Sequence, residues 1–186
     1  MSKGSTHDKF SFFLIPIIIL IAILMLEFTQ LNKLLFVCLV VGFYIIGFLF
    51  FSPDLDLKGN SYYRWRFLRF IWIPYQKVIP HRSILSHGIF IGTMLRIFYL
   101  FFIGNIFTSF LYFLFTNKNN LSLFSECFFK INSSFFNYIS IYKEVSISIF
   151  IGLELAAIYH IFMDVSSSFI KLKKIKPKKI FKKIFK

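Results

Sequence analysis

Four long apolar segments constrain this chain more than any other feature. They cover residues 10–27, 34–51, 88–115 and 146–168, and a transmembrane helix needs ~20 mostly apolar residues. Because the backbone polar groups of a membrane span must be satisfied within the chain, such segments form helices. The expected fold class is therefore all-α, a polytopic membrane helix bundle with about four transmembrane helices. A hydrophobic content of 57% in 186 residues favours the same class over a soluble globular protein.

The first apolar segment, "FSFFLIPIIILIAILMLE", has the character of a signal peptide core. No cleavage site with small residues follows it, so we interpret it as a retained helix that tolerates Pro16 in its first turns. The short link "TQLN" then predicts that the second span lies antiparallel to the first.

Aromatic residues alternate with Arg64, Arg66 and Arg69 in "YYRWRFLRFIWIPYQKVIP", between the second and third spans. Arginines and stacking rings could form a nucleic-acid surface. The same pattern is typical of an amphipathic helix that lies in the membrane interface. We favour the interfacial helix and expect no nucleic-acid partner.

Two further polar segments complete the chain. Residues 117–144 are rich in Asn and Ser and predict a loop. Residues 171–186, "KLKKIKPKKIFKKIFK", form a polybasic tail that anionic lipid headgroups would attract. Residues 1–170 are expected to form a single membrane-embedded domain. Cys38 and Cys127 lie far apart in sequence and predict two free thiols.

The distribution of Lys and Arg predicts the orientation in the cell (inner) membrane. With a cytoplasmic N-terminus, the basic region from Lys58 to Arg82 and the basic tail also face the cytoplasm. Cytoplasmic loops of membrane proteins carry an excess of Lys and Arg. We therefore expect a multi-pass protein with both termini in the cytoplasm.

In this orientation all four histidines and four of the eight acidic residues gather at the cytoplasmic ends of the predicted spans. The candidate metal ligands are His7, Asp8, Asp54, Asp56, His81, His87, His160 and Asp164.

The spacing of these residues suits a divalent metal ion. His160 and Asp164 are four residues apart and share one face of a helix. Imidazole and carboxylate together suit zinc or manganese, and iron as well. Eight candidates exceed the needs of one tetrahedral ion and allow a site with two ions. Taken singly, most have a structural explanation: Asp54 and Asp56 beside a proline can cap a turn.

Arg96 and Glu154 are charged residues within the third and fourth spans. Their sequence positions place them at similar depths, since a helix rises ~1.5 Å per residue. We expect a buried ion pair between them that joins the two helices.

Four segments of the chain resemble a family of small bacterial membrane proteins known only as predicted metal-binding proteins. These segments are "KGSTHDKF", "SPDLDLKGN", "YRWRFLRFIWIPYQKVIPHRSILSHGIFIGTMLRIFYL" and "ELAAIYHIFMD". More distantly, the order PD-x-D, HR-x(3)-SH and H-x(3)-D is similar to an inner-membrane family of metal-dependent hydrolases. That similarity implies a metal site made by Asp54, Asp56, His81, His87, His160 and Asp164, and the closer family adds His7.

The expected function is that of an integral membrane metal-binding protein, a metal-dependent hydrolase of phosphoesters or lipid-derived substrates at the cytoplasmic face. Arg82 is a candidate phosphate contact. The alternative is a non-catalytic membrane protein with a structural or sensing metal site. A metal transporter fits less well, because transporter sites usually lie near the bilayer midplane. The sequence leaves the substrate and the oligomeric state open.

Overall fold

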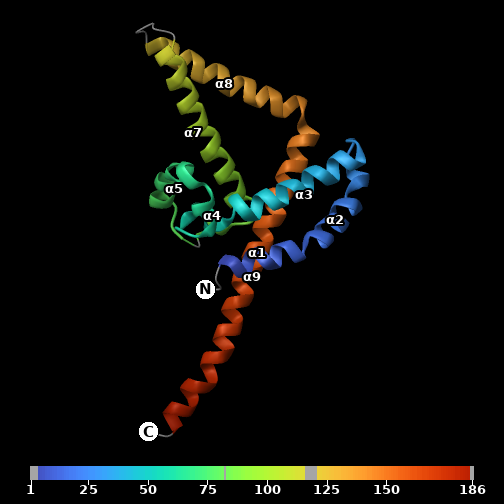
Figure 1. The fold of residues 1–186 in the computed structure, drawn as a ribbon, viewed down its shortest axis with the longest axis vertical. Helices are drawn as coiled ribbons and strands as arrows, with labels where there is room; N and C mark the ends of the chain where they lie inside the picture. The colour runs from blue at the N-terminus through green and yellow to red at the C-terminus, as the bar shows by residue number, and fades with distance from the viewer. Residues whose placement is uncertain (1–3, 82, 116–120, 185–186) are drawn as a thin grey trace.

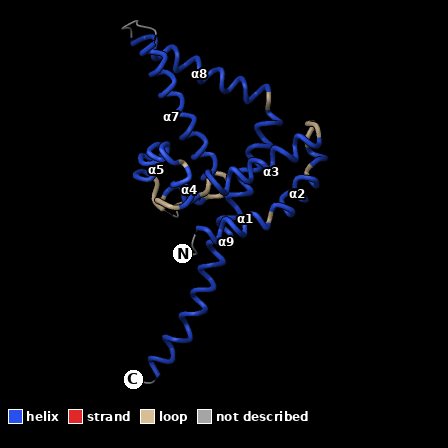
Figure 2. Tube along the Cα trace, in the orientation of Figure 1, coloured by secondary structure: helices blue, strands red, loops and turns tan. Residues whose placement is uncertain are grey.

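The computed structural model describes residues 4–81, 83–115 and 121–184, with side chains described for residues 8–81, 83–115 and 124–168. Within these ranges all regular structure is helical and no strand is present, which confirms the all-α class (Figures 1 and 2). The α-helices are α1 (Gly4–Phe13), α2 (Ile15–Leu24), α3 (Lys33–Phe50), α4 (Asn60–Arg64), α5 (Trp72–Val78), α6 (Ile84–His87), α7 (Ile91–Phe115), α8 (Leu121–Ile141) and α9 (Lys143–Ile184). The 3₁₀ turns are η1 (Leu26–Phe28), η2 (Pro53–Asp56) and η3 (Arg66–Ile71).

Three helical segments are long and apolar enough to cross a membrane: Lys33–Asp56, Ile91–Phe115 and Lys143–Ser168. They correspond to the second, third and fourth predicted spans. The expected count of four continuous transmembrane helices is therefore reduced to three among the described residues.

The first predicted span consists of two helices, α1 and α2, which meet at Leu14. Pro16 occupies the first turn of α2, where its missing N–H costs nothing, whereas a continuous helix would need that N–H. The two helices together still run alongside α3. Asp8 pairs with Arg64 near the end of α3, and the Thr29 hydroxyl donates to Glu144 at the start of α9 over 3.0 Å.

Helices α3 and α9 cross at the centre of the molecule and form its most extensive helix contact (Figure 1). Small residues permit the close approach. A Cβ atom added at Gly152 would lie 2.4 Å from the Val40 carbonyl oxygen, and one added at Gly47 would lie 2.6 Å from Cβ of Ala156. Interfaces of this type are common in membrane bundles, where helices associate through close packing.

The predicted interfacial helix over residues 62–80 is replaced by three short helical pieces, α4, η3 and α5. Arg66, between α4 and the rest of η3, adopts a φ of 49° in the left-handed region, which ends one helix and redirects the chain. Trp72 and Tyr75 turn inward and form a small core with Leu55. The aromatic and arginine pattern therefore marks a folded segment with exposed Phe67 and Phe70, not one straight amphipathic helix.

The predicted loop over residues 117–144 is also wrong, because residues 121–141 form α8. Its half-buried side chains Phe124, Phe128, Ile131 and Phe135 recur at helical spacing. Phe135 stacks on Phe101 of α7 with ring centroids 3.9 Å apart. Figure 1 shows α8 joining the far end of α7 to the start of α9.

The polybasic tail continues α9 as a helix to Ile184 and extends away from the other helices (Figure 1). Its lipid contacts and the single domain over residues 1–170 stay predictions.

Candidate metal centre

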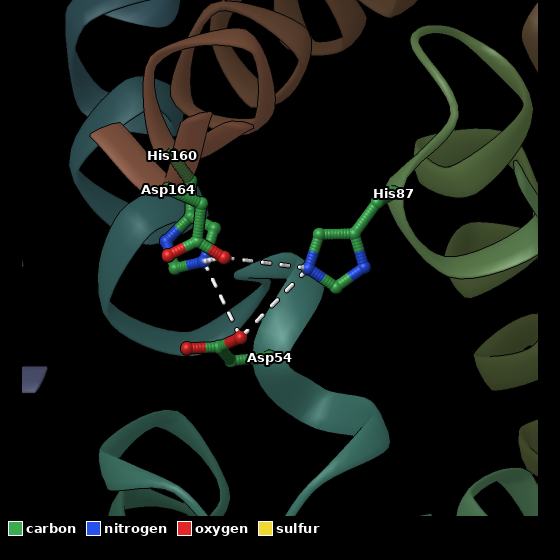
Figure 3. Close-up of side chains that lie close together, drawn as sticks. All are labelled: Asp54, His87, His160 and Asp164. Carbon is green, nitrogen blue, oxygen red and sulfur yellow. Dashed lines mark ion pairs between the residues drawn. The ribbon is translucent and has the colours of Figure 1, made fainter. Parts of the chain in front are cut away.

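Three segments distant in sequence bring acidic and histidine side chains to one place, at the ends of α3 and α6 and midway along α9. Ser52 caps η2 by accepting a hydrogen bond from the Asp54 N–H, which fixes the turn that carries Asp54 and Asp56. Ser83 caps α6 in the same way, and α6 ends at His87. His160 and Asp164 occupy successive turns of α9 and face the other two segments (Figure 3).

The first group of possible ligands comprises Asp54, His87, His160 and Asp164. Oδ1 of Asp54 lies 3.4 Å from Nε2 of His160 and 3.9 Å from Nε2 of His87. Oδ2 of Asp164 lies 4.0 Å from each of these two nitrogens. Bonds of ~2.0–2.2 Å to a tetrahedral ion would separate the donor atoms by ~3.3–3.6 Å. A small contraction of the observed group would therefore give that geometry.

In His87 and His160, the second ring nitrogen, Nδ1, contacts a serine hydroxyl. Nδ1 of His87 lies 2.8 Å from Oγ of Ser86, and Nδ1 of His160 lies 3.3 Å from Oγ of Ser52. A proton on Nδ1 that is donated to the serine leaves the Nε2 lone pair directed at the group. Such partners fix the tautomer and orientation of metal-bound histidines.

His87 has further properties of a ligand. Its Nε2 atom is buried and has no hydrogen-bond partner in the described part of the chain, and such an atom is costly unless something binds it. Burial lowers the pKa of His87 below its usual value, which favours the neutral imidazole. Metal ions bind that neutral form.

A second group of possible ligands, Asp56, His81 and His87, adjoins the first. The Asp56 carboxylate is buried, and its two oxygens lie 3.0 and 3.1 Å from Nδ1 of His81. Its Oδ2 atom also lies 3.7 Å from Nδ1 of His87. His87 therefore belongs to both groups, although a proton on Nδ1 that is donated to Ser86 leaves only Nε2 free to bind an ion.

A small polar hollow lies beside Asp54 and His160 and offers about 20 Å³ to water. A cavity needs ~10–15 Å³ of volume open to water to hold one water molecule. The hollow is lined by Asp8, Ser11, Phe48, Ser52, Asp54, Asn60, Ser61 and His160. Space for a water-sized ligand therefore exists next to two of the possible metal ligands.

Six of the eight predicted ligands come together in the two groups. Asp8 lies outside both groups. Its carboxylate pairs with Arg64 and borders the hollow. The backbone of His7 belongs to α1, but its side chain lies outside the described residues, as does Arg82. The roles predicted for these three residues are not tested by the structure.

Arg96 and Glu154 are both buried and their charges attract each other, but backbone contacts replace the direct ion pair that was expected between them. Arg96 donates to Ser86 and Thr93, and Glu154 accepts from the Phe90 N–H. Sequence reasoning correctly expected both residues to be buried. It missed that a loop lies between them and takes up their hydrogen bonds.

Ser52 is the site residue that the sequence analysis overlooked. It stands directly before Pro53, where a serine is an ordinary turn cap, and its contact with His160 joins residues 108 positions apart. No local signal in the sequence distinguishes this serine from a cap. Ser86, by contrast, is adjacent to His87 in the chain.

Comparison with known protein families matches most of this chain to one of them. A family model described as "Uncharacterized metal-binding protein (DUF2227)" matches residues 2–174. The chain belongs to this family. The matched range includes all eight predicted ligands. The activity of the family is open, so its description supports metal binding and no reaction.

A relative from Aquifex aeolicus (strain VF5), described as "Uncharacterized protein", is 45% identical over 58 residues. The match covers 31% of this chain and 40% of that relative. No solved structure matches this chain. The distant similarity to metal-dependent hydrolases is not supported by these comparisons.

Proposed function

We propose that this protein is a multi-pass membrane enzyme that hydrolyses a phosphoester or lipid-derived ester with a bound divalent metal ion. The observation that carries the proposal is the pairing of two histidines and two aspartates within reach of one ion, beside a hollow that fits one water molecule. Structural zinc sites are closed by four protein ligands, whereas catalytic sites keep a position for water. Four protein ligands alone would close the site, but the adjoining hollow offers space for water as a fifth ligand, or in place of one carboxylate, and so favours the catalytic type.

Asp54, His87, His160 and Asp164 would hold the ion, and zinc or manganese suits this mixture of donors. A bound ion of this kind lowers the pKa of its water toward ~7 and so supplies a nucleophile at neutral pH. Ser52 and Ser86 would orient the two imidazoles. Asp8 and Asn60, which line the hollow, would contact the water or the reacting group.

The second group offers a place for a second ion. Asp56 and His81 would contribute one carboxylate and one imidazole, and His87 lies between the two groups. Two ions ~3.5–4 Å apart stabilise both the attacking and the leaving oxygen in many phosphoesterases. With one ion only, Asp56 would instead orient His81 and His87. Metal-to-protein ratios of two or one distinguish these arrangements.

An open groove of about 380 Å³ favours an anionic, lipid-derived substrate. It is lined by Phe50, Asn60, Tyr63, Arg64 and Arg66. Asn60 also lines the hollow at the metal centre, so the two spaces adjoin. The arginines would attract a phosphate group, and if α3 crosses the membrane, its end would lie with the groove at a membrane face. Arg82 remains a proposed phosphate contact.

The membrane setting belongs to the same proposal. The three apolar helices would cross the inner membrane, with α1 and α2 together as a fourth crossing. The metal centre, both termini and the basic segment from α4 to α5 would then face the cytoplasm. Anionic lipid headgroups would bind the polybasic tail.

The test combines metal analysis with a search for turnover. We expect the purified wild-type protein to retain one or two zinc or manganese ions per chain, and Asp54→Asn and His87→Ala to lose them. Glu27→Gln, which removes an exposed carboxylate far from the site, is the matched control and should keep them. The metal-loaded wild type should hydrolyse a phosphoester or a lipid in a broad panel, and the two site variants should not.

The alternative is a non-catalytic protein whose ion braces the helices or reports metal supply. One observation favours it: the possible ligands come from three elements, η2, α6 and α9, which an ion would tie together. Metal bound without turnover on the whole panel, together with a large rise in melting temperature, would support this alternative. Wild-type protein without any stoichiometric metal would refute both functions.

A further inference from the structure

We propose that Arg96 and Glu154 are positioning residues that hold His87 in place from the two ends of its loop. The His87 loop is defined as residues 86–90, which are the last two residues of α6 and the three that connect it to α7. This inference rests on the proposed metal centre, because it concerns how one of its ligands is fixed. It adds two buried charged residues to that centre, neither of which is a possible ligand.

Arg96 holds the first end of the His87 loop. Its side chain is 1% exposed within α7, and its Nη1 group donates to the Ser86 carbonyl oxygen over 2.9 Å. Nη2 donates to Oγ1 of Thr93 over 3.1 Å, which fixes the guanidinium on its own helix. The hydroxyl of Ser86 in turn contacts Nδ1 of His87. Arg96 is therefore two contacts away from the imidazole.

A glycine makes the first contact possible. A Cβ atom added at Gly92 would lie 2.7 Å from the Ser86 carbonyl oxygen and 3.5 Å from Nη1 of Arg96. The Gly92 N–H also donates to the Gly88 carbonyl oxygen over 2.9 Å. The start of α7 is therefore shaped to receive the His87 loop and the arginine together.

Glu154 holds the other end of the loop. Its side chain is 8% exposed within α9, and its Oε1 atom accepts a hydrogen bond from the Phe90 N–H over 2.8 Å. Phe90 has a φ of 70°, a conformation that an aromatic residue rarely adopts without support. Because Glu154 lies on the helix of His160 and Asp164, its bond ties the loop directly to the element that carries the other ligands.

The cost of these charges argues against an incidental role. Ionisable side chains inside membrane spans are rare because they are expensive, and they usually mark function. Here each one binds a backbone group of the same five-residue loop, one on either side of His87. The two charges attract each other, but the hydrogen bonds described for both side chains go to the loop or, for Arg96, to Thr93, and none joins one side chain to the other.

The experiment measures Co²⁺ binding by visible absorption, because Co²⁺ reports both affinity and ligand geometry. Glu154→Leu removes the acceptor for the Phe90 N–H, and Glu154→Gln retains an oxygen at the same position. We expect Glu154→Leu to weaken Co²⁺ binding ~10-fold or more and to alter the absorption bands, as loss of supporting partners around metal ligands does. Glu154→Gln should bind within about threefold of the wild type, given that scale. Arg96→Leu should resemble Glu154→Leu.

Asn105→Leu is the matched control. Asn105 is a buried polar residue of α7, 3% exposed, whose side chain contacts Ser109 rather than the His87 loop. Its replacement should leave Co²⁺ affinity and spectrum unchanged. Helix content by circular dichroism separates loss of binding from loss of folding, and the Glu154 variants decide the matter if Arg96→Leu does not fold.

Wild-type affinity in folded Glu154→Leu would overturn the proposal, and so would equal losses in Glu154→Leu and Asn105→Leu. A wild-type protein that binds no Co²⁺ would overturn it together with the metal centre. Binding without hydrolysis, by contrast, would remove the enzymatic function and leave the positioning role intact.

Discussion

The hydroxyl groups beside His87 and His160 are the smallest features on which the proposed metal centre depends. Ser86 is fully buried, and its hydroxyl lies 2.8 Å from the His87 ring. We expect Ser86→Ala to weaken Co²⁺ binding ~10-fold, because the imidazole loses the partner that fixes its tautomer. The backbone carbonyl that Arg96 contacts is unchanged in this variant, so the measurement isolates the hydroxyl.

Ser109→Ala serves as the control for that substitution. Ser109 is equally buried and contacts Asn105 within α7, away from the possible ligands. Its variant should bind Co²⁺ as tightly as the wild type. Similar affinities for Ser86→Ala and the wild type would show that the hydroxyl does not support His87.

The Asp8 carboxylate forms an ion pair with Arg64, whereas the sequence predicts it as a metal ligand. Its oxygens pair with Arg64, which also donates to the Leu49 carbonyl oxygen, and the two side chains are 19% and 28% exposed. We expect Asp8→Asn to keep the metal content of the wild type and to lose about 1 kcal/mol of stability, as a partly exposed ion pair would. Metal analysis and a thermal melt measure the two effects. Loss of the ion in Asp8→Asn would make Asp8 a ligand, as the sequence predicts.

Most of the candidate site could be predicted at the residue scale because acidic residues and histidines are few in this chain, 8 and 4 respectively. Asp54, His87 and Asp164 stand out against apolar neighbours, and their position at span ends already suggests a shared face. The partner of Asp8 could not be predicted in this way. Arg64 lies 56 residues away in a segment whose path depends on the left-handed turn at Arg66.

At the scale of elements, hydrophobic length located the spans but not the breaks within them. Residues 34–51 and 88–115 appear as α3 and α7 with nearly the expected bounds. The join at Leu14 and the division of residues 62–80 depend on local backbone geometry. Average hydropathy does not register such geometry. Helix α8 was missed for another reason, since its Asn and Ser residues mask the apolar face that packs on α7.

The contact between α3 and α9 leads to a prediction about glycine. In Gly152→Ala the new methyl group would meet the Val40 carbonyl oxygen at 2.4 Å and Cβ of Phe43 at 2.9 Å. The backbone of α3 must then move away. We expect a loss of ~1–3 kcal/mol, the usual cost of overpacking, measured by thermal or denaturant unfolding in detergent. Metal affinity should fall as well, because α9 carries two possible ligands.

Gly42→Ala is the counterpart on α3. No heavy atom lies within 4 Å of a Cβ atom added at Gly42, and alanine favours the helix over glycine by ~0.5–1 kcal/mol. This variant should be as stable as the wild type or slightly more stable. Equal destabilisation by both substitutions would show that the loss in Gly152→Ala does not come from the α3–α9 contact.

At the scale of the whole molecule, the possible ligands lie near one end of the apolar spans, and α8 runs between the opposite ends of α7 and α9 (Figure 1). The possible ligands follow α3, precede α7 and lie about midway along α9. From His160 to the start of α9 at Lys143 is a rise of ~26 Å, close to the thickness of a bilayer core. The exposed basic residues of the segment from α4 to α5, such as Arg69 and Lys77, share the end with the ligands.

This arrangement predicts which side chains a membrane-impermeant reagent can reach. Cys38 and Cys127 are both free thiols and would first be replaced by alanine. In that background, Lys77→Cys on α5 and Lys130→Cys on α8 each place one thiol at an exposed position. Lys and Arg favour the cytoplasmic side, and the end with the ligands is the more basic one. We therefore expect an impermeant maleimide to label Lys130→Cys in intact cells and to label Lys77→Cys only after the inner membrane is permeabilised. Labelling of both thiols in intact cells would place the metal centre and α8 on the same side of the membrane and refute the crossing by α7. The reverse pattern would place the metal centre outside the cell membrane and remove cytoplasmic substrates from the proposal.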